Sequence, residues 1–314
     1  MAADIPIDDC FLHDKDRLRH DEAISLLRQN LPCVAETETA LLTQAANRVL
    51  AEDLSAEHDV PLHNNAAVDG YAFKHADLSK KPMPVSDRVA AGDINPKALD
   101  SKTAVRIFTG AVMPVGADSV AMQEDCIVDD GKVTLPAKLK TGANCRLAGE
   151  DLQSGELVLN SGKRLTAPDI AAIASIGAAK FRAFQKLKVL IISSGDELRA
   201  VSENSTSLKP GEVWDSNSPL LAALLEKLPV DVTHATILED NLDAVETALL
   251  EGSKAFDVII TTGGASRGSE DHMLAALDKV GKRHLWQLAV KPGRPMMFGQ
   301  IPHADDANDC FYFG

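Results

Sequence analysis

One stretch decides the fold: KLKVLIISSGDEL, from Lys186 to Leu198. Its run of branched apolar residues stops abruptly at Ser-Ser-Gly, a pattern typical of a strand buried on both faces of a parallel sheet. Ligands of such sheets bind at the carboxyl ends of the strands. The acids that follow the run, Asp196 and Glu197, therefore lie where we expect a binding site.

A second stretch repeats this pattern: FDVIITTGGASRGSED, from Phe256 to Asp271. An apolar strand again ends in small residues, whose short or missing side chains let a ligand approach backbone N–H groups. Two strand ends of this kind, each followed by carboxylates, predict one shared crevice at the edge of the sheet.

The composition is that of a folded, acidic protein. Its 314 residues, 45% of them hydrophobic, suffice for two or three domains with ordinary cores. A formal net charge of -14 without clustered Lys and Arg excludes a nucleic-acid surface, because phosphates must be neutralised by cations. A small anionic ligand held by a few local cations is still compatible with this charge.

The sequence indicates a soluble, cytoplasmic protein. It shows no secretory signal and no apolar run long enough to cross a bilayer, so we expect no membrane segment. Five widely spaced cysteines, without the paired spacing of a zinc site or a disulfide framework, are predicted to be reduced thiols. They are Cys10, Cys33, Cys126, Cys145 and Cys310.

The first half of the chain combines helices with short strands. Apolar residues at helical spacing predict helices over Asp21–Leu31, Thr37–Leu50 and Ala167–Ile176. Between Pro82 and Gly149, short β segments broken by turn residues indicate a small all-β domain. We expect the third helix to return to the first helical region, which makes the β domain an insertion.

From Lys186 onward, strands and helices alternate as in doubly wound α/β folds with a mostly parallel sheet. The pattern predicts strands over Val230–Leu238, Val258–Thr262 and Trp286–Val290, with helices over Asn241–Leu250 and His272–Val280. A further helix is predicted to begin at Ser218-Pro219, with one apolar face made of Leu220, Leu221, Leu224, Leu225 and Leu228.

Acidic residues at the strand ends are candidate metal ligands. Asp196 and Glu197 would suit a hard cation such as Mg²⁺, or would instead stabilise the first turn of a helix. Asp240 and Asp271 each precede a predicted helix, and either one alone is better explained as an N-cap. Together with Asp215 and Glu197 they should converge on one sheet edge, where four carboxylates would repel each other unless a cation or ligand were present.

Two loops are candidates for binding an anion. Lys291 and Arg294 bracket a Pro-Gly pair and would hold two cations near one anionic group, although a solvated basic turn is the alternative. The loop after the second strand offers oxyanion donors, although a tight turn explains its glycines equally well. These donors are Thr261, Thr262, Gly263, Gly264 and Ser266.

Three polar residues lie outside the α/β region, so its sheet geometry assigns them no role: Asp69, Thr109 and Asp151. Asp69 is explained by the turn that it makes with Gly70. The sequence shows no Ser-His-Asp set, nucleophilic cysteine neighbourhood or histidine-based metal spacing.

Six motifs, in this order, resemble those of the MoeA/gephyrin E-domain family, the molybdopterin molybdenumtransferases. The resemblance extends from about Leu18 to Gly314. The motifs are NAAVDGYA from Asn65, TGA from Thr109, GED from Gly149, SGDEL from Ser194, TGGASRG from Thr262 and KPGRP from Lys291. We therefore expect a discontinuous helical and extended linker domain (1–60 and 150–182), an inserted β domain (61–149) and a Mog-like molybdopterin-binding α/β domain (183–314).

The resemblance implies an enzyme of the last stage of molybdenum cofactor biosynthesis. Such an enzyme splits the phosphoanhydride of adenylylated molybdopterin with a divalent cation, Mg²⁺, and inserts molybdate with release of AMP. The family also implies a homodimer, in which the β domain of one subunit faces the α/β domain of the other, and substrate handover from a molybdopterin adenylyltransferase. A non-catalytic pterin carrier and a gephyrin-like scaffold are the alternatives.

Motif positions also imply which residues form the site. The implied catalytic residues are Asp69, Thr109, Asp151, Glu197, Asp240 and Asp271, of which Glu197, Asp240 and Asp271 would bind the metal. The implied binding residues are Gly195, Asp215, Thr262, Gly263, Gly264, Ser266, Lys291 and Arg294.

The chain departs from the family pattern in two places. The aspartate that usually precedes Asn-Ser in the first motif is His63, and the Asn-Ser position reads Asn64-Asn65. Family members continue beyond the position of Gly314 with a Pro-Gly-Asn-Pro loop, its helix and a further β domain. We therefore expect a chain that is truncated at its C-terminus.

Overall fold

The computed structural model describes residues 18–203, 205, 207–263, 272–289, 295–302 and 309–314. These residues form two compact units. Unit 1 comprises Met1–Glu38, Asn47–Val49 and Ala183–Gly314, and unit 2 comprises Thr39–Ala46 and Leu50–Arg182. The three-domain division expected from the sequence stays a prediction.

Unit 1 is built on a six-stranded sheet with the strand order β16-β13-β17-β20-β19-β18. The pairs β13/β16, β13/β17 and β17/β20 are parallel, whereas β19 pairs antiparallel with both β18 and β20. The strand bounds are β13 Leu187–Ser193, β16 Val230–His234, β17 Val258–Thr262, β18 Lys282–Gln287, β19 Pro295–Ile301 and β20 Cys310–Phe313. This mostly parallel sheet confirms the predicted α/β class.

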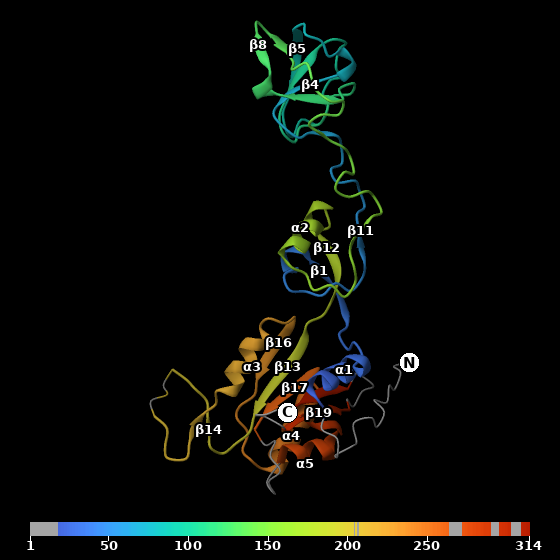
Figure 1. Cartoon of the computed structure of the whole chain (residues 1–314). Helices are drawn as coiled ribbons and strands as arrows, with labels where there is room; N and C mark the ends of the chain where they lie inside the picture. The colour runs from blue at the N-terminus through green and yellow to red at the C-terminus, as the bar shows by residue number, and fades with distance from the viewer. Residues whose placement is uncertain (1–17, 204, 206, 264–271, 290–294, 303–308) are drawn as a thin grey trace. The chain divides into compact units, whose positions relative to one another are not determined.

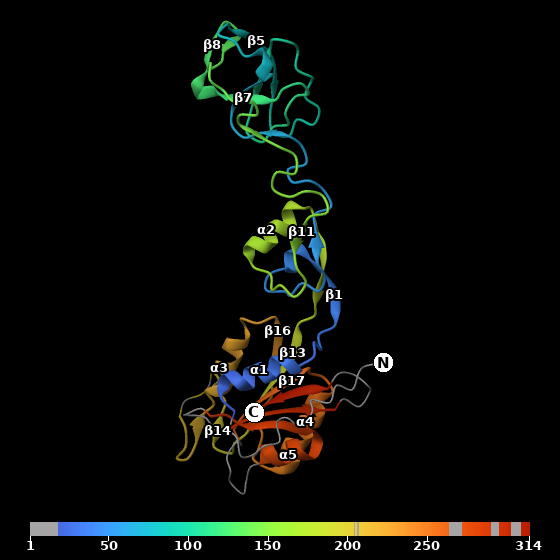
Figure 2. The same cartoon turned by 45° about the vertical axis from the view of Figure 1, so that its right-hand side comes forward.

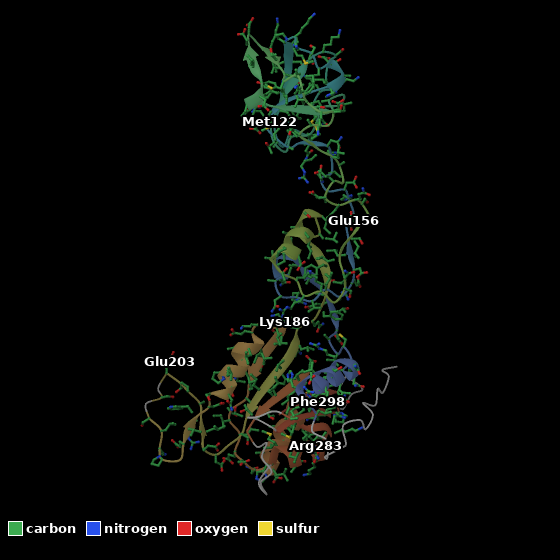
Figure 3. The ribbon with its side chains drawn as sticks, in the orientation of Figure 1. Met122, Glu156, Lys186, Glu203, Arg283 and Phe298 are labelled. Atoms are coloured by element: carbon green, nitrogen blue, oxygen red, sulfur yellow. The ribbon has the colours of Figure 1, made fainter. Side chains whose placement is uncertain are left out.

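Helices cover both faces of this sheet (Figure 1). On one face, α4 (Leu242–Ser253) and α5 (His272–Val280) bury Leu249 and Leu277 against Ile192 of β13. On the other face, α1 (His20–Asn30) packs Leu27 against Phe298 of β19, which Figure 3 labels. The remaining elements of unit 1 are α3 Asn217–Leu225 and the paired short strands β14 Leu198–Arg199 and β15 Val213–Trp214.

Three predictions for unit 1 were wrong. A short strand, β14, follows Gly195 where a helix was considered, so Asp196 and Glu197 stabilise no helix start. Helix α3 begins at Asn217 instead of Ser218-Pro219, and it buries no residue. Its Leu220 is 58% exposed and Leu224 54% exposed, although α3 contacts β13 and the edge strand β16.

Unit 2 contains a second six-stranded sheet, of order β7-β4-β6-β5-β9-β8 (Figure 2). Its strands are β4 Gly70–Phe73, β5 Met83–Val89, β6 Ala104–Ile107, β7 Ser119–Met122, β8 Ile127–Asp129 and β9 Lys132–Thr134. Three two-stranded sheets involve β1 Thr37–Leu41 with β12 Lys180–Phe184, β2 Leu54–Ser55 with β11 Leu157–Leu159, and β3 Asn65–Ala66 with β10 Cys145–Arg146. The helical segments are α2 Ala167–Ser175, η1 Leu42–Gln44, η2 His75–Asp77 and η3 Gln123–Asp125.

The helix predicted over Thr37–Leu50 does not form. The segment begins as strand β1, which pairs with β12, and continues as the short 3-10 helix η1. Thr37 and Thr39 are β-branched and alternate with other residues, which favours an extended strand over a helix. The partner strand lies far away in the sequence, so apolar spacing alone could not reveal the pairing.

Leu249→Ala is expected to destabilise unit 1 by about 2–5 kcal/mol, because Leu249 has no exposed surface and its truncation leaves a cavity. Leu250→Ala is the matched control, since the neighbouring side chain is 39% exposed and should cost less than about 1 kcal/mol. Urea unfolding followed by tryptophan fluorescence measures both. Equal losses would contradict the packing described for α4.

Candidate functional site

The candidate site in unit 1 lies at the carboxyl end of β13. Ser193 ends this strand and Ser194 follows it, and both are almost fully buried. Gly263, which follows β17, has a φ of 94°, and a Cβ placed there would lie 2.2 Å from the Ser194 carbonyl oxygen. Only glycine therefore allows the two strand ends to approach so closely.

Asp215 ties this strand end to the start of α3. Its buried carboxylate accepts hydrogen bonds from the hydroxyls of Ser193 (2.8 Å) and Ser218 (2.6 Å). It also accepts the backbone N–H groups of Asn217 (3.0 Å) and Ser218 (3.1 Å). Burial alone would raise the pKa of Asp215, but the hydrogen bonds from Ser218, Ser193 and Asn217 outweigh it and lower the pKa. Four donors from the protein itself therefore surround the Asp215 carboxylate. Its contact with a ligand stays a prediction.

The loops that follow β13 and β16 meet at this edge. Ser194 forms a parallel bridge with Leu238, and the backbone N–H of Asp240 donates to the Asp196 carboxylate over 3.0 Å. The Glu197 carboxylate folds back against Gly195, where a Cβ would lie 2.6 Å from it. Two adjacent loops that carry acidic residues therefore meet at this edge, and the crevice expected there stays a prediction.

Asp240 is not the N-cap of α4, so the sequence-based interpretation of this residue as an N-cap was wrong. The cap is Asn241, whose side-chain oxygen accepts the backbone N–H of Ala244 over 2.8 Å. The Asp240 side chain is thus not required for capping. Thr262 contributes its hydroxyl, which accepts a hydrogen bond of 2.8 Å from the Asn217 side chain.

Five predicted site residues lie outside the described residues: Gly264, Ser266, Asp271, Lys291 and Arg294. Among the residues that the structure does describe, no group of three or more His, Cys, Asp or Glu side chains is placed to hold a metal ion. No helix in that same part of the chain has both the length and the apolar composition of a membrane span.

The predicted site residues of unit 2 form two separate polar pairs. Asp69 accepts the backbone N–H (2.8 Å) and the hydroxyl (2.7 Å) of Thr109. These two hydrogen bonds, followed by the charge of Arg106, hold the pKa of Asp69 below its ordinary value despite some desolvation. Asp151 pairs with Arg146 over 2.5 Å, and this contact raises the pKa of Arg146.

Sequence reasoning missed Arg106, Arg146 and Asn217. Arg146 lies five residues before Asp151 in the same segment, and Arg106 lies three residues before Thr109. These spacings were visible, but neither is a pattern that predicts a contact. The partners are fixed by a turn and by strand register, which the structure supplies.

Comparisons with known proteins agree on one family. A model described as MoeA N-terminal region (domain I and II) matches residues 18–177, and one described as Probable molybdopterin binding domain matches residues 190–313. A molybdopterin molybdenumtransferase of Haemophilus influenzae is 38% identical over 286 residues, which cover 90% of this chain and 70% of that protein. A gephyrin of Dictyostelium discoideum is 32% identical over 306 residues, which cover 90% of this chain and 43% of gephyrin.

Solved structures give the same result. The molybdopterin biosynthesis moeA protein of Pyrococcus horikoshii OT3 superimposes with a TM-score of 0.77 and 28% sequence identity. The match covers 95% of this chain and 74% of that one. The chain thus spans only part of each relative's length, less than half in the case of gephyrin.

Asp215→Asn is expected to destabilise unit 1 by about 1–3 kcal/mol at pH 7, because an amide leaves some of the buried donors unsatisfied. A lowered folded pKa stabilises the fold above the unfolded value of about 3.9, and this contribution is lost as the pH falls through the folded pKa. The difference between the two proteins should therefore be full at pH 7 and shrink below about pH 4. Urea unfolding at several pH values measures it.

The control for this prediction is Glu226→Gln, an exposed carboxylate at the end of the same helix. It should change stability little at any of these pH values. A loss in Asp215→Asn that is independent of pH would show that shape, not the charged hydrogen bonds, is what Asp215 contributes.

Proposed function

The chain belongs to the MoeA family of molybdopterin molybdenumtransferases, and from that premise we propose that it inserts molybdenum from molybdate into adenylylated molybdopterin with release of AMP. The observation that carries the proposal is the meeting of two acidic loops at the carboxyl edge of the unit 1 sheet, where parallel sheets bind ligands. The hydroxyl groups of serine and threonine at this edge are donors that suit a phosphate.

The pterin phosphate would bind among Gly195, Thr262 and Gly263, with Asp215 fixing the strand end beneath it. We further propose that Gly264, Ser266, Lys291 and Arg294 complete this binding site. Hydroxyls and cations suit the oxyanions of both the phosphoanhydride and molybdate. The family's chemistry needs both of these anions to be bound near each other.

A divalent cation, Mg²⁺, is proposed to be held by Glu197, Asp240 and Asp271. The donor chemistry fits, because Mg²⁺ prefers oxygen ligands and usually combines one or two carboxylates with substrate phosphates. Asp240 is available for this role, since Asn241 caps α4 in its place. A bound cation would neutralise charge on the phosphoanhydride oxygens.

The unit 2 residues Asp69, Thr109 and Asp151 are proposed to act on the substrate as acid, base or hydrogen-bonding groups. The Asp69 carboxylate is held in place by Thr109 and stays ionised, so it is suited to orient a water or a substrate group by accepting a hydrogen bond. Asp151 is held by Arg146 in a similar way. We also propose three functional domains. The first is discontinuous and comprises residues 1–60 and 150–182, the second comprises 61–149, and the third comprises 183–314.

We propose that the protein works as a cytoplasmic homodimer that receives its substrate from a molybdopterin adenylyltransferase. The exposed leucines of α3 support a subunit contact, since apolar surface of this kind often marks an interface. Light scattering of the purified chain is expected to give twice its 33.5 kDa mass. A monomeric mass at micromolar concentration would contradict this proposal.

AMP release from adenylylated molybdopterin, with molybdate and Mg²⁺, tests the proposed activity. Asp69→Asn is expected to lower the turnover about 100-fold or more, because a neutral amide cannot act as a base. Asp129→Asn is the matched control, since this exposed aspartate lies on β8 of the same unit and away from the site. It should leave turnover unchanged.

Three outcomes of this assay are informative. Release that requires both molybdate and Mg²⁺ would support the proposal. Binding of the adenylylated pterin without AMP release would favour a pterin carrier instead. Failure to bind the pterin at all would contradict both and favour a scaffold.

A further inference from the structure

One guanidinium connects Gly70, the residue after Asp69, to Gln123. Arg106 of β6 donates from Nη1 to the carbonyl oxygen of Gly70 over 3.0 Å, and from Nη2 to the side-chain oxygen of Gln123. Gln123 in turn donates its backbone N–H to the carbonyl oxygen of Asp69 over 3.0 Å. Arg106 and Gln123, here called the Arg106–Gln123 clamp, therefore fix two consecutive carbonyl groups, those of Asp69 and Gly70.

Two aromatic rings hold the guanidinium of the clamp in place. The Arg106 Cζ atom lies 5.1 Å from the ring centroid of Tyr71 and 4.7 Å from that of Phe108. Tyr71 is the register partner of Arg106 in the antiparallel pair of β4 and β6, so the two side chains share one face of the sheet. A planar, permanently charged group suits this position, which a lysine ammonium could not fill in the same way.

The backbone beside Asp69 lies so close to the neighbouring strand that only glycine fits at position 70. A Cβ on Gly70 would lie 1.8 Å from the carbonyl oxygen of Ala121 on the neighbouring strand β7. The last residue of β7, Met122, is labelled in Figure 3 and is the register partner of Gly70. Gln123 follows directly, so the close contact between β4 and β7 also places the clamp.

The clamp and Thr109 act on different parts of the same residue. Thr109 lies three residues after Arg106 and holds the Asp69 carboxylate through its N–H and hydroxyl groups. The clamp holds the main chain that carries this carboxylate. With both ends fixed, the carboxylate and the hydroxyl have one relative position.

The charge of Arg106 acts on Asp69 and also on Cys126, which follows the acids Glu124 and Asp125 of η3. Burial raises the pKa of Cys126 to about 11, Asp125 and Glu124 raise it as well, and Arg106 opposes them. A second cation, Arg88 of β5, places its Cζ atom 4.6 Å from the centroid of the Phe108 ring, which Arg106 also contacts.

We propose that Arg106 is a positioning residue for the Asp69–Thr109 pair, which it holds in a single geometry through the Arg106–Gln123 clamp. The catalytic consequence rests on the proposed function, because it requires Asp69 and Thr109 to act on the substrate. The geometric consequence does not, and it can be measured without any substrate.

The first test is an NMR titration of the Thr109 amide in the full chain, since this N–H donates to Asp69 and reports on its ionisation. In Arg106→Met the titration should move to higher pH, because a positive charge that lowers the pKa of Asp69 is gone. Hydrogen exchange of the Thr109 amide should become about tenfold faster or more, as the pair loses its fixed geometry.

The second test is the AMP-release assay. Arg106→Met is expected to lower kcat by about 10- to 100-fold with little change in KM, which is the cost of misplacing a reacting group. Arg106→Lys keeps the charge but loses the two-pronged contact, so the Thr109 titration should stay near its original pH while kcat remains low. Gln123→Ala removes only the second half of the clamp and covers the case in which Arg106→Met fails to fold.

Arg88→Met is the matched control. Arg88 is an exposed arginine that contacts the same Phe108 ring, but its position does not connect to the carbonyls of Asp69 and Gly70. It should change kcat and the Thr109 exchange rate by less than about twofold. Equal losses in Arg88→Met and Arg106→Met would overturn the proposal, since ring packing or local charge would then explain both.

The two tests separate the proposal from the function on which it rests. Unchanged exchange and titration of Thr109 in Arg106→Met, or in Gln123→Ala, would overturn the positioning role whatever the activity. If the unaltered chain released no AMP, the proposed function would fail, while the Thr109 measurements would still decide the role of Arg106.

Discussion

The burial of β13 on both faces and both edges is the constraint on which unit 1 depends. The strand is hydrogen-bonded to β16 on one side and β17 on the other, and Ile191 and Ile192 are almost fully buried on opposite faces. Polar side chains cannot be placed along such a strand without losing their hydration. They gather instead at its carboxyl end, where the chain leaves the sheet, and this is why the acidic loops lie there.

The close approach of strand ends then shapes this edge. Because Gly263 brings the backbone after β17 against the Ser194 carbonyl, the edge consists of tightly packed main chain. Asp215 is buried against this edge, and the loop after β13 folds the Glu197 carboxylate against Gly195. The geometry thus separates closely packed backbone and hydroxyl groups from the carboxylates of the loops, which is compatible with the proposed binding of anionic groups and a cation together.

Both units use the same device to hold a carboxylate. Asp69 with Thr109, Asp215 with Ser218, and Asp169 with Thr166 each combine a hydroxyl with a backbone N–H as donors to one acid. In a chain with a net charge of -14, such pairs distinguish acids with a fixed orientation from those that simply face water. A fixed acid is costly to rearrange, so it is either a structural anchor, as Asp215 is, or a group whose orientation matters to the chemistry.

The sequence by itself determined the elements whose signal is local. The apolar runs of β13 and β17 and the periodicity of α4 and α5 specify their structure through their own burial. The tertiary structure decided the rest, because it depends on partners distant in the chain: the strand Thr37–Leu41 pairs with Lys180–Phe184. The site divides in the same way. Motifs predicted Asp69 and Thr109 as site residues, and this stays a prediction. The contact of Arg106 with Gly70 follows from strand register, which is defined only when the strands pair.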